Sequence, residues 1–227
     1  MNTRTLASTC GMPLWKALVG MGVLRTAVCF AGLAVTCFAG AQTTSMWTIP
    51  VADILGHREV TWGYSLSGSE RNISGGTYGH YHNGIVGLFD RIELAFGNDF
   101  FGTTTYGAKV LLWEGDTCAI SGGYHNFDRY RSDLFLVSRY DGKGYRLHAG
   151  LQRDDRWRGL VGVDFPLFGD HSGAIDHVTG PNGYTSAGVN LSLPRLPGLT
   201  ISTYVGVPNT KGDGITHTVC ITYGFRF

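Results

Sequence analysis

Alternation of apolar and small polar residues is the feature that most restricts how this chain can fold. Between Leu199 and Val207 one set of positions holds Leu199, Ile201, Thr203, Val205 and Val207, and the other holds Thr200, Ser202, Tyr204 and Gly206. The segments 90–97, 145–152, 187–193 and 216–227 alternate in the same way. A period of two residues places successive side chains on opposite faces of a β-strand. The pattern therefore predicts an all-β protein.

Turn-forming residues divide the alternating sequence into twelve expected strands. Clusters of glycine with proline, aspartate or asparagine mark the breaks, as in Asp141–Gly144, Gly180–Gly183 and Lys211–Gly214. The expected strands are 58–67, 77–88, 90–98, 104–114, 116–124, 132–140, 143–152, 156–166, 172–178, 183–193, 198–208 and 214–227. The alternative is ten strands, which would follow if 77–88 and 172–178 are not strands.

The composition of the two faces indicates a lipid environment. The chain has 34 glycines, 12% aromatic residues and only 15% charged residues, and its polar positions are mostly Gly, Ser and Thr. Strands of about ten residues with one apolar and one small-polar face are typical of transmembrane β-barrels. Lipid offers no hydrogen-bond partners, so such a sheet must close on itself. We therefore predict a closed antiparallel transmembrane β-barrel, with a periplasmic or secreted β-sandwich as the alternative.

The lengths of the connections favour the barrel. Connections after the second, fourth, sixth and tenth expected strands are short, and those after the first, third, fifth and eleventh tend to be longer. Barrels of the bacterial outer membrane combine short periplasmic turns with longer outer loops in this way.

The N-terminal residues 1–41 have the features of an export signal. Their charged residues are all basic (Arg4, Lys16 and Arg25), and an apolar stretch from Ala27 to Phe38 precedes Ala39-Gly40-Ala41. This pattern is typical of a cleaved signal peptide. We expect residues 1–41 to be the signal peptide, 42–57 a periplasmic lead-in segment and 58–227 the barrel. The lead-in has a second possible placement, as a plug in the lumen, which would weaken the case for a channel.

The last expected strand carries aromatic residues at alternate positions, Tyr223, Phe225 and Phe227. This arrangement is typical of the signal that the outer-membrane assembly machinery reads. We expect the protein in the bacterial cell outer membrane, with that machinery, outer-membrane lipid and lipopolysaccharide as partners. Aromatic girdles near the strand ends are expected from Trp62, Tyr64, Tyr78, Tyr81, Trp113, Tyr130, Tyr140, Trp157, Tyr204 and Tyr223.

Three short motifs resemble a known group of proteins. They are Ile49–Gly56, which contains Pro50 and Ala52, then Gly87–Leu94, and then Gly107–Leu112, which begins Gly-Ala-Lys. Their order is similar to that of small bacterial outer-membrane β-barrels, including the exopolysaccharide-associated, YjbH-like barrels. The resemblance implies the same fold and location, and it suggests an association with polysaccharide export.

Strand parity predicts which charged residues face the lumen. They are Arg91, Glu93, Lys109, Asp133, Arg139, Arg146, His148, Arg158, Asp164 and Asp176. An outward Arg or Lys would cost roughly 2–4 kcal/mol at the middle of the bilayer, so the inward placement is favoured. One interpretation is a salt-bridge network that supports or plugs the barrel. The other is a cationic track that guides an anionic solute or polysaccharide.

Other functional classes receive less support from the residues. A lipid-modifying enzyme is the alternative function, but its candidate groups, His80, His82, His125, Ser132, Asp133 and His148, show no spacing typical of a nucleophile beside a base. His80 and His82 share a strand face, yet a metal site requires three or four ligands. We therefore assign no catalytic residue, metal or cofactor.

Two further observations complete these expectations. Parity places Cys118 and Cys220 on opposite faces of the sheet, which argues against a disulfide. The net charge of +1 argues against nucleic acid as a partner. The expected function is a structural barrel or a passive channel associated with small solutes or polysaccharide.

Overall fold

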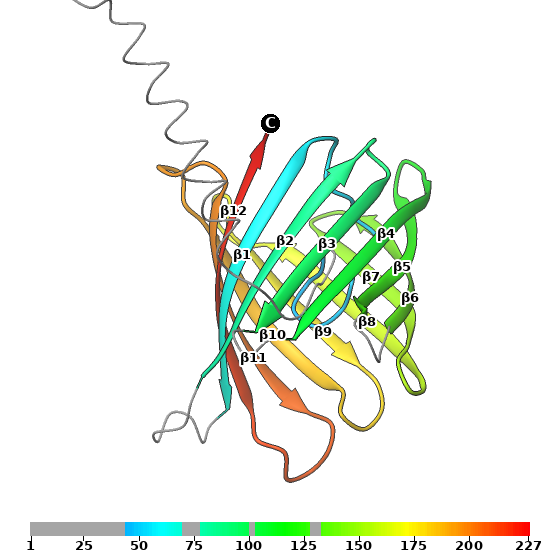
Figure 1. Cartoon of the computed structure of the whole chain (residues 1–227), viewed down its shortest axis with the longest axis vertical. Coiled ribbons are helices and arrows are strands. Elements are labelled where there is room, and N and C mark those ends of the chain that lie inside the picture. Colours follow the sequence, from blue (N-terminus) through cyan, green and yellow to red (C-terminus); the bar gives the residue numbers. More distant parts are fainter. Residues whose placement is uncertain (1–43, 70–77, 100–102, 128–132) are drawn as a thin grey trace, which may run out of the picture. The chain divides into compact units, whose positions relative to one another are not determined.

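A computed structural model of the chain describes residues 44–69, 78–99, 103–127 and 133–227. The described residues form a closed antiparallel barrel in which each strand pairs with its sequence neighbours and β1 pairs with β12 (Figure 1). The strands are β1 (Glu59–Ser69), β2 (Gly79–Leu88), β3 (Ile92–Asp99), β4 (Thr104–Glu114), β5 (Cys118–Phe127), β6 (Asp133–Gly142), β7 (Tyr145–Arg153), β8 (Trp157–Pro166), β9 (Ser172–Val178), β10 (Tyr184–Ser192), β11 (Leu199–Pro208) and β12 (Thr216–Arg226). The prediction of twelve strands is confirmed, and the alternative of ten is wrong because 79–88 and 172–178 are both strands. The expected signal peptide lies outside the described residues.

Within the described residues, no helix has both the length and the apolar character needed to cross a membrane.

The two faces of the barrel differ in the way that the alternation predicts. Large apolar side chains cover the outer face and are widely exposed, among them Leu94, Leu112, Leu134, Leu136, Leu151, Val161, Val205 and Ile221. The intervening positions point inward, where Glu93, Lys109 and Ser121 are fully buried. Apolar residues outside and charged residues inside are the reverse of a water-soluble barrel, and this distribution suits a lipid surround.

The barrel has two distinct ends. β1 begins and β12 ends at the same end, here called the terminal end, which is uppermost in Figure 1. Its connections are 89–91, 115–117, 143–144, 167–171 and 193–198. The opposite, distal end has the connections 70–78, 100–103, 128–132, 154–156, 179–183 and 209–215. The longest connections, 70–78 and 209–215, are therefore both distal.

One connection is longer than the sequence suggested. The chain leaves β10 at Ser192 and begins β11 only at Leu199, so the prediction of a short connection after the tenth strand is wrong. The difference lies at Leu193 and Gly198, which were expected in the strands, and Gly198 has a positive φ of 85° that does not continue a strand. The segment instead forms successive turns, in which Leu196 donates to the Leu193 carbonyl and Leu199 to the Leu196 carbonyl, each at 2.9 Å.

Candidate functional site in the barrel lumen

The lead-in, residues 44–57, lies inside the barrel rather than in front of it. Ile49 and Ala52 are each 1% exposed and pack against inward-facing apolar residues of β4 to β9. The barrel residues in this cluster are Leu111, Ala119, Phe135, Val137, Leu160 and Val178. The first part of the lead-in folds back on itself, since Met46 donates to the Ile49 carbonyl and Val51 to the Thr44 carbonyl. The segment thus occupies part of the lumen as a compact plug, so a solute could pass only through the space left beside it.

A buried ion pair on β3 and β4 holds both ends of this plug. Lys109 Nζ lies 3.0 Å from Glu93 Oε2, and both side chains are fully buried. Glu93 accepts hydrogen bonds from the backbone N–H groups of Thr44, at 3.0 Å, and Leu55, at 2.6 Å, and from the Thr44 hydroxyl. Lys109 donates to the Thr44 and Val51 carbonyls, each at 3.1 Å. The two charges therefore satisfy each other and the irregular backbone of the lead-in.

Asp176 on β9 binds the turn of the plug. Its carboxylate accepts hydrogen bonds from the backbone N–H groups of Trp47, at 2.9 Å, and Thr48, at 2.7 Å, and from the Thr48 hydroxyl, at 2.7 Å. The Trp47 indole donates to the Ala174 carbonyl at 2.9 Å and stacks on Tyr204, with 5.1 Å between the ring centroids. This corner of the lead-in is fixed on two sides.

Asp53 of the lead-in joins two arginines of the barrel wall. It pairs with Arg139 on β6, and its Oδ1 lies 3.2 Å from Arg146 Nη1 on β7. Arg146 Nε also bonds both carboxylate oxygens of Asp164 on β8, at 2.9 and 3.1 Å. His148 Nε2 lies 2.7 Å from the same carboxylate. Arg139 also pairs with Asp141 and Glu114, so six charged groups and one imidazole form a continuous network around the lead-in.

The remaining lumen candidates lie apart from the lead-in. Asp133 is fully buried, accepts a hydrogen bond from Asn126 at 2.9 Å, and lies 3.7 Å from His125 Nε2. Arg158 is 6% exposed and pairs with Asp154 near the distal end.

Asp155 follows Asp154 in the distal turn 154–156. Hydrogen bonding from Arg156 holds the pKa of Asp155 well below its usual range.

Arg91 does not lie on a strand of the lumen wall. Phe89 and Asp90 have positive φ values of 57° and 55°, so β2 and β3 are joined by a tight turn and β3 begins only at Ile92. Arg91 occupies that turn and is exposed. Parity placed it inward because the expected strand began two residues too early.

Some features of the lumen were not anticipated from the sequence. The inner face carries an apolar cluster where only polar residues were expected. A signal existed in β6, where Leu134, Phe135, Leu136 and Val137 are apolar at every position, which indicates burial on both faces. Gly162 leaves room for the lead-in, since a Cβ there would lie 2.8 Å from Met46 Sδ and 2.9 Å from Ile49 Cδ1.

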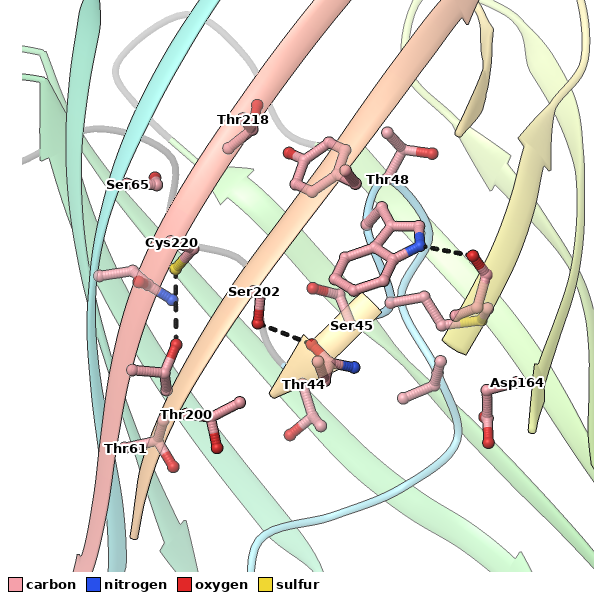
Figure 2. A pocket seen from close by; sticks show the side chains of 18 of the residues that line it. Thr44, Ser45, Thr48, Thr61, Ser65, Asp164, Thr200, Ser202, Thr218 and Cys220 are labelled. Atoms are coloured by element: carbon pink, nitrogen blue, oxygen red, sulfur yellow. Dashed lines mark hydrogen bonds between the residues drawn. The ribbon is translucent and has the colours of Figure 1, made fainter. Parts of the chain in front are cut away.

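The lead-in leaves a cavity of about 680 Å³ beside it, shown in Figure 2. Its wall is mainly neutral hydroxyl, amide and aromatic groups from β1, β2 and β9 to β12, including Thr61, Ser65, Ser67, Asn83, Asn190, Thr200, Ser202, Thr218 and Thr222. Asp53, Arg146 and Asp164 supply its charged groups. A second cavity of about 400 Å³ shares Arg146, Asp164 and Ser172 with the first. The Arg146 bridge therefore lies where the two spaces meet.

Two of the residues expected in the aromatic girdles line this cavity instead. Tyr81 and Tyr204 point inward, because their paired neighbours Ser65 and Thr218 are lumen residues. Tyr130 lies outside the described residues, and Trp62, Trp113, Tyr140, Trp157 and Tyr223 are exposed on the barrel surface.

The candidate enzyme and metal groups are dispersed. His80 and His82 lie on the outer face, where the Tyr64 hydroxyl contacts His80 Nδ1 at 2.8 Å. His125 and His148 lie inside, each beside an aspartate. Ser132 is outside the described residues, and within these no group of three potential ligands could hold a metal ion.

Cys118 and Cys220 fall on opposite faces of the sheet. Cys118 shares the outer face with Ile120, and Cys220 lines the cavity. Both are free thiols.

A closed barrel with an apolar outer belt and a polar, partly filled lumen defines the class of outer-membrane β-barrels. Its fold is similar to that of the KdgM porin, with a TM-score of 0.53 and 12% sequence identity over 73% of this chain and 99% of the porin. A structure of "KdgM porin in complex with disordered oligogalacturonate" gives a TM-score of 0.56 at the same identity and coverage. A weaker match, with a TM-score of 0.21 and 12% identity, is to Ail, the attachment invasion locus protein of Yersinia pestis, and covers 74% of this chain and 95% of that protein.

No protein-family model matches the sequence, and no curated protein matches it either. The likeness to the KdgM porin therefore identifies the fold alone. The link to exopolysaccharide export stays a prediction.

Proposed function

We infer that this protein is a passive outer-membrane channel for small uncharged hydroxylated solutes, saccharides among them. The observation that carries this inference is the cavity of about 680 Å³, whose wall is mostly Ser, Thr, Asn and Tyr. Hydroxyl and amide groups can exchange hydrogen bonds with sugar hydroxyls without requiring charge. A volume of this size is within the range of pockets that hold small molecules.

The distribution of charge supports a neutral path over a cationic one. Lys109, Arg139 and Arg158 are paired with carboxylates, and Lys109 is fully buried against Glu93. Arg146 is the cation that reaches the cavity, and it lies between Asp53 and Asp164. Positive charge at this point is therefore balanced locally, and a continuous track for anions is not formed.

The primary experiment is liposome swelling with the refolded full chain. We expect a pentose or hexose to enter faster than a sugar acid of similar size, because the wall offers hydroxyls and balanced charges. Planar-bilayer recordings should show small steps with weak ion selectivity. A barrel that is folded and heat-modifiable but neither swells liposomes nor conducts would overturn the channel and leave a structural role.

An anion-selective channel is the second candidate, favoured by the partial exposure of Arg146, whose side chain is 44% exposed. A porin of similar fold, KdgM, has a structure in complex with disordered oligogalacturonate, and this supports testing the second candidate. Strong anion selectivity in the wild-type chain would support it against the neutral path. Asp53→Asn removes the carboxylate shared by Arg139 and Arg146 and should shift the reversal potential toward anions. Asp213→Asn, in an exposed distal loop, is the matched control and should leave the potential unchanged.

A further inference from the structure

The outer wall has an uneven distribution of ionisable side chains. Within the described strands, the outward positions carry no Asp or Glu, and those that can hold positive charge are His80, His82, Arg153, His177 and His217. All five lie in the distal half of their strands, β2, β7, β9 and β12. The terminal half of the outer wall presents apolar and aromatic residues. We call these five residues the distal basic belt.

Hydroxyl groups orient three of the imidazole rings. The Tyr64 hydroxyl contacts His80 Nδ1 at 2.8 Å, and the Tyr78 hydroxyl contacts His217 Nε2 at 3.2 Å. On the other side of the barrel the Thr185 hydroxyl contacts His177 Nδ1 at 2.9 Å. A hydroxyl donates to a neutral imidazole nitrogen and accepts from a protonated one. Each ring can therefore gain a proton without losing this partner.

The other two members of the belt pack on aromatic rings. His82 lies 4.8 Å from the Tyr64 ring and 5.6 Å from the Trp62 ring, between centroids. The Arg153 guanidinium lies 5.9 Å from the centroid of Trp157, and Arg153 is exposed. Tyrosine and tryptophan favour the level of lipid headgroups, and Trp157 at the distal start of β8 supports a position of Arg153 near the membrane surface.

We propose that the distal basic belt binds the anionic phosphates of lipid headgroups in the leaflet at the distal end. No outward Asp or Glu lies on the described strands, so the belt gives this part of the outer wall a positive charge that complements a phosphate-rich surface. Histidine is suited to this position because its neutral form costs less to bury beside lipid than a permanent cation. The proposal concerns the outer wall and is independent of solute passage through the lumen.

The groups that face the belt allow its charge to follow pH. Among the described residues, Tyr64 and Tyr78 are the tyrosines that contact His80 and His217, and His80 and His82 share the outer face of β2. Asn98 on β3, Val205 on β11, Val161 on β8 and Thr185 on β10 are uncharged neighbours. Near Arg153, the turn residues Asp154 and Asp155 pair with Arg158 and Arg156. The imidazole of a free histidine has a pKa near 6.5. Lipid binding should therefore strengthen as the pH falls from 8 to 5.5.

Native mass spectrometry of the refolded full chain tests the proposal directly. Micelles would contain equal amounts of phosphatidylglycerol and phosphatidylcholine with the same acyl chains. Phosphatidylglycerol keeps one negative charge between pH 5.5 and 8, so a change in its binding across that range reports on the protein. We expect it to be retained over phosphatidylcholine by about fivefold or more at pH 5.5, the effect of one or more added charges, and clearly less at pH 8.

A combined variant separates the histidines from the rest of the surface. His80→Gln, His82→Gln, His177→Gln and His217→Gln keep polar side chains but remove the titratable charge, and the preference should become independent of pH. Lys143→Gln with Arg195→Gln removes two cations from terminal turns and should leave the preference unchanged. If the combined variant does not fold, His177→Gln and His217→Gln separately should each lower the preference at pH 5.5. Equal retention of both lipids at pH 5.5, or a pH effect that persists without the histidines, would overturn the proposal.

Discussion

Glu93 and Lys109 lie opposite each other on β3 and β4, and each is fully buried. Between them they bind Thr44, Val51 and Leu55 of the lead-in through backbone groups. Taking both charges from water is costly, and the pair offsets that cost only while every partner is present. The most buried charges of the lumen therefore serve attachment of the lead-in rather than contact with a solute.

Removing one charge of this pair should be strongly destabilising. In Glu93→Gln the Lys109 ammonium stays buried without its counter-ion, and we expect the free energy of unfolding to fall by about 3–5 kcal/mol. Urea unfolding of the protein in lipid vesicles measures this change. Glu59→Gln, at the terminal end of β1, is a suitable comparison and should cost less than about 1 kcal/mol, because the Gln carbonyl can still accept the 2.8 Å hydrogen bond from the Gly56 N–H. Equal losses in the two variants would contradict the role given to Glu93.

Single residues also show how far the sequence could be interpreted. Strand parity placed Glu93, Lys109 and Asp176 on the same face as the small polar residues, and the structure has them buried inside. Their partners could not be found in this way, because the lead-in has no regular period that parity could use. The prediction for Arg91 was wrong for a related reason. The turn at Phe89 and Asp90 depends on positive φ angles, which a two-residue alternation of side chains does not reveal.

At the level of elements, the lead-in packs closely against the strands that face it. Gly87 on β2 is the clearest example, because a Cβ there would lie 2.3 Å from the Gly56 carbonyl oxygen and 2.4 Å from that of Leu55. These are backbone atoms, which cannot rotate away as a side-chain tip can. Glycine at this position lets the lead-in approach the wall where it joins β1.

Gly87→Ala should loosen the lead-in while leaving strand pairing intact. The added methyl displaces the Leu55–Gly56 backbone and weakens the Leu55 N–H bond to Glu93. We expect amide hydrogen exchange of the lead-in to accelerate by about tenfold or more, equivalent to about 1.4 kcal/mol of local opening free energy. Gly122→Ala controls for a methyl added to a strand, since its nearest contacts are 3.4 Å away. An unchanged exchange rate in Gly87→Ala would show that the lead-in is not held at this point.

For the molecule as a whole, the sequence was sufficient to predict the barrel but not to predict which residues fill its lumen. The repeat in β7, β10, β11 and β12 is regular enough to predict strand number and the direction of each face. A barrel's interior depends instead on contacts between residues far apart in sequence, such as Trp47 with Asp176. Lys109, Arg139 and Arg146, which contributed to the predicted cationic track, are instead paired with carboxylates around the lead-in.

Closure of the whole barrel depends on the seam between β1 and β12, and the aromatic residues of β12 suggest a separate role in assembly. Tyr223 and Phe225 stack with 5.9 Å between ring centroids, while the Phe227 side chain is 65% exposed beyond the strand. Its backbone N–H donates to the Arg58 carbonyl at 3.2 Å, a contact that any residue could make. Phe227 is therefore expected to contribute little to the stability of the folded barrel.

Phe227→Ala separates folding stability from assembly in the cell. The free energy of unfolding of refolded protein should change by no more than about 0.5 kcal/mol, as for other exposed positions. The amount of heat-modifiable barrel in the outer membrane of expressing cells should nevertheless fall, because the assembly machinery would lose an aromatic contact. Phe168→Ala provides the matched control, since Phe168 is 69% exposed in the terminal turn 167–171. Normal membrane levels of Phe227→Ala, or an equal fall in Phe168→Ala, would assign the β12 aromatics to the lipid interface alone.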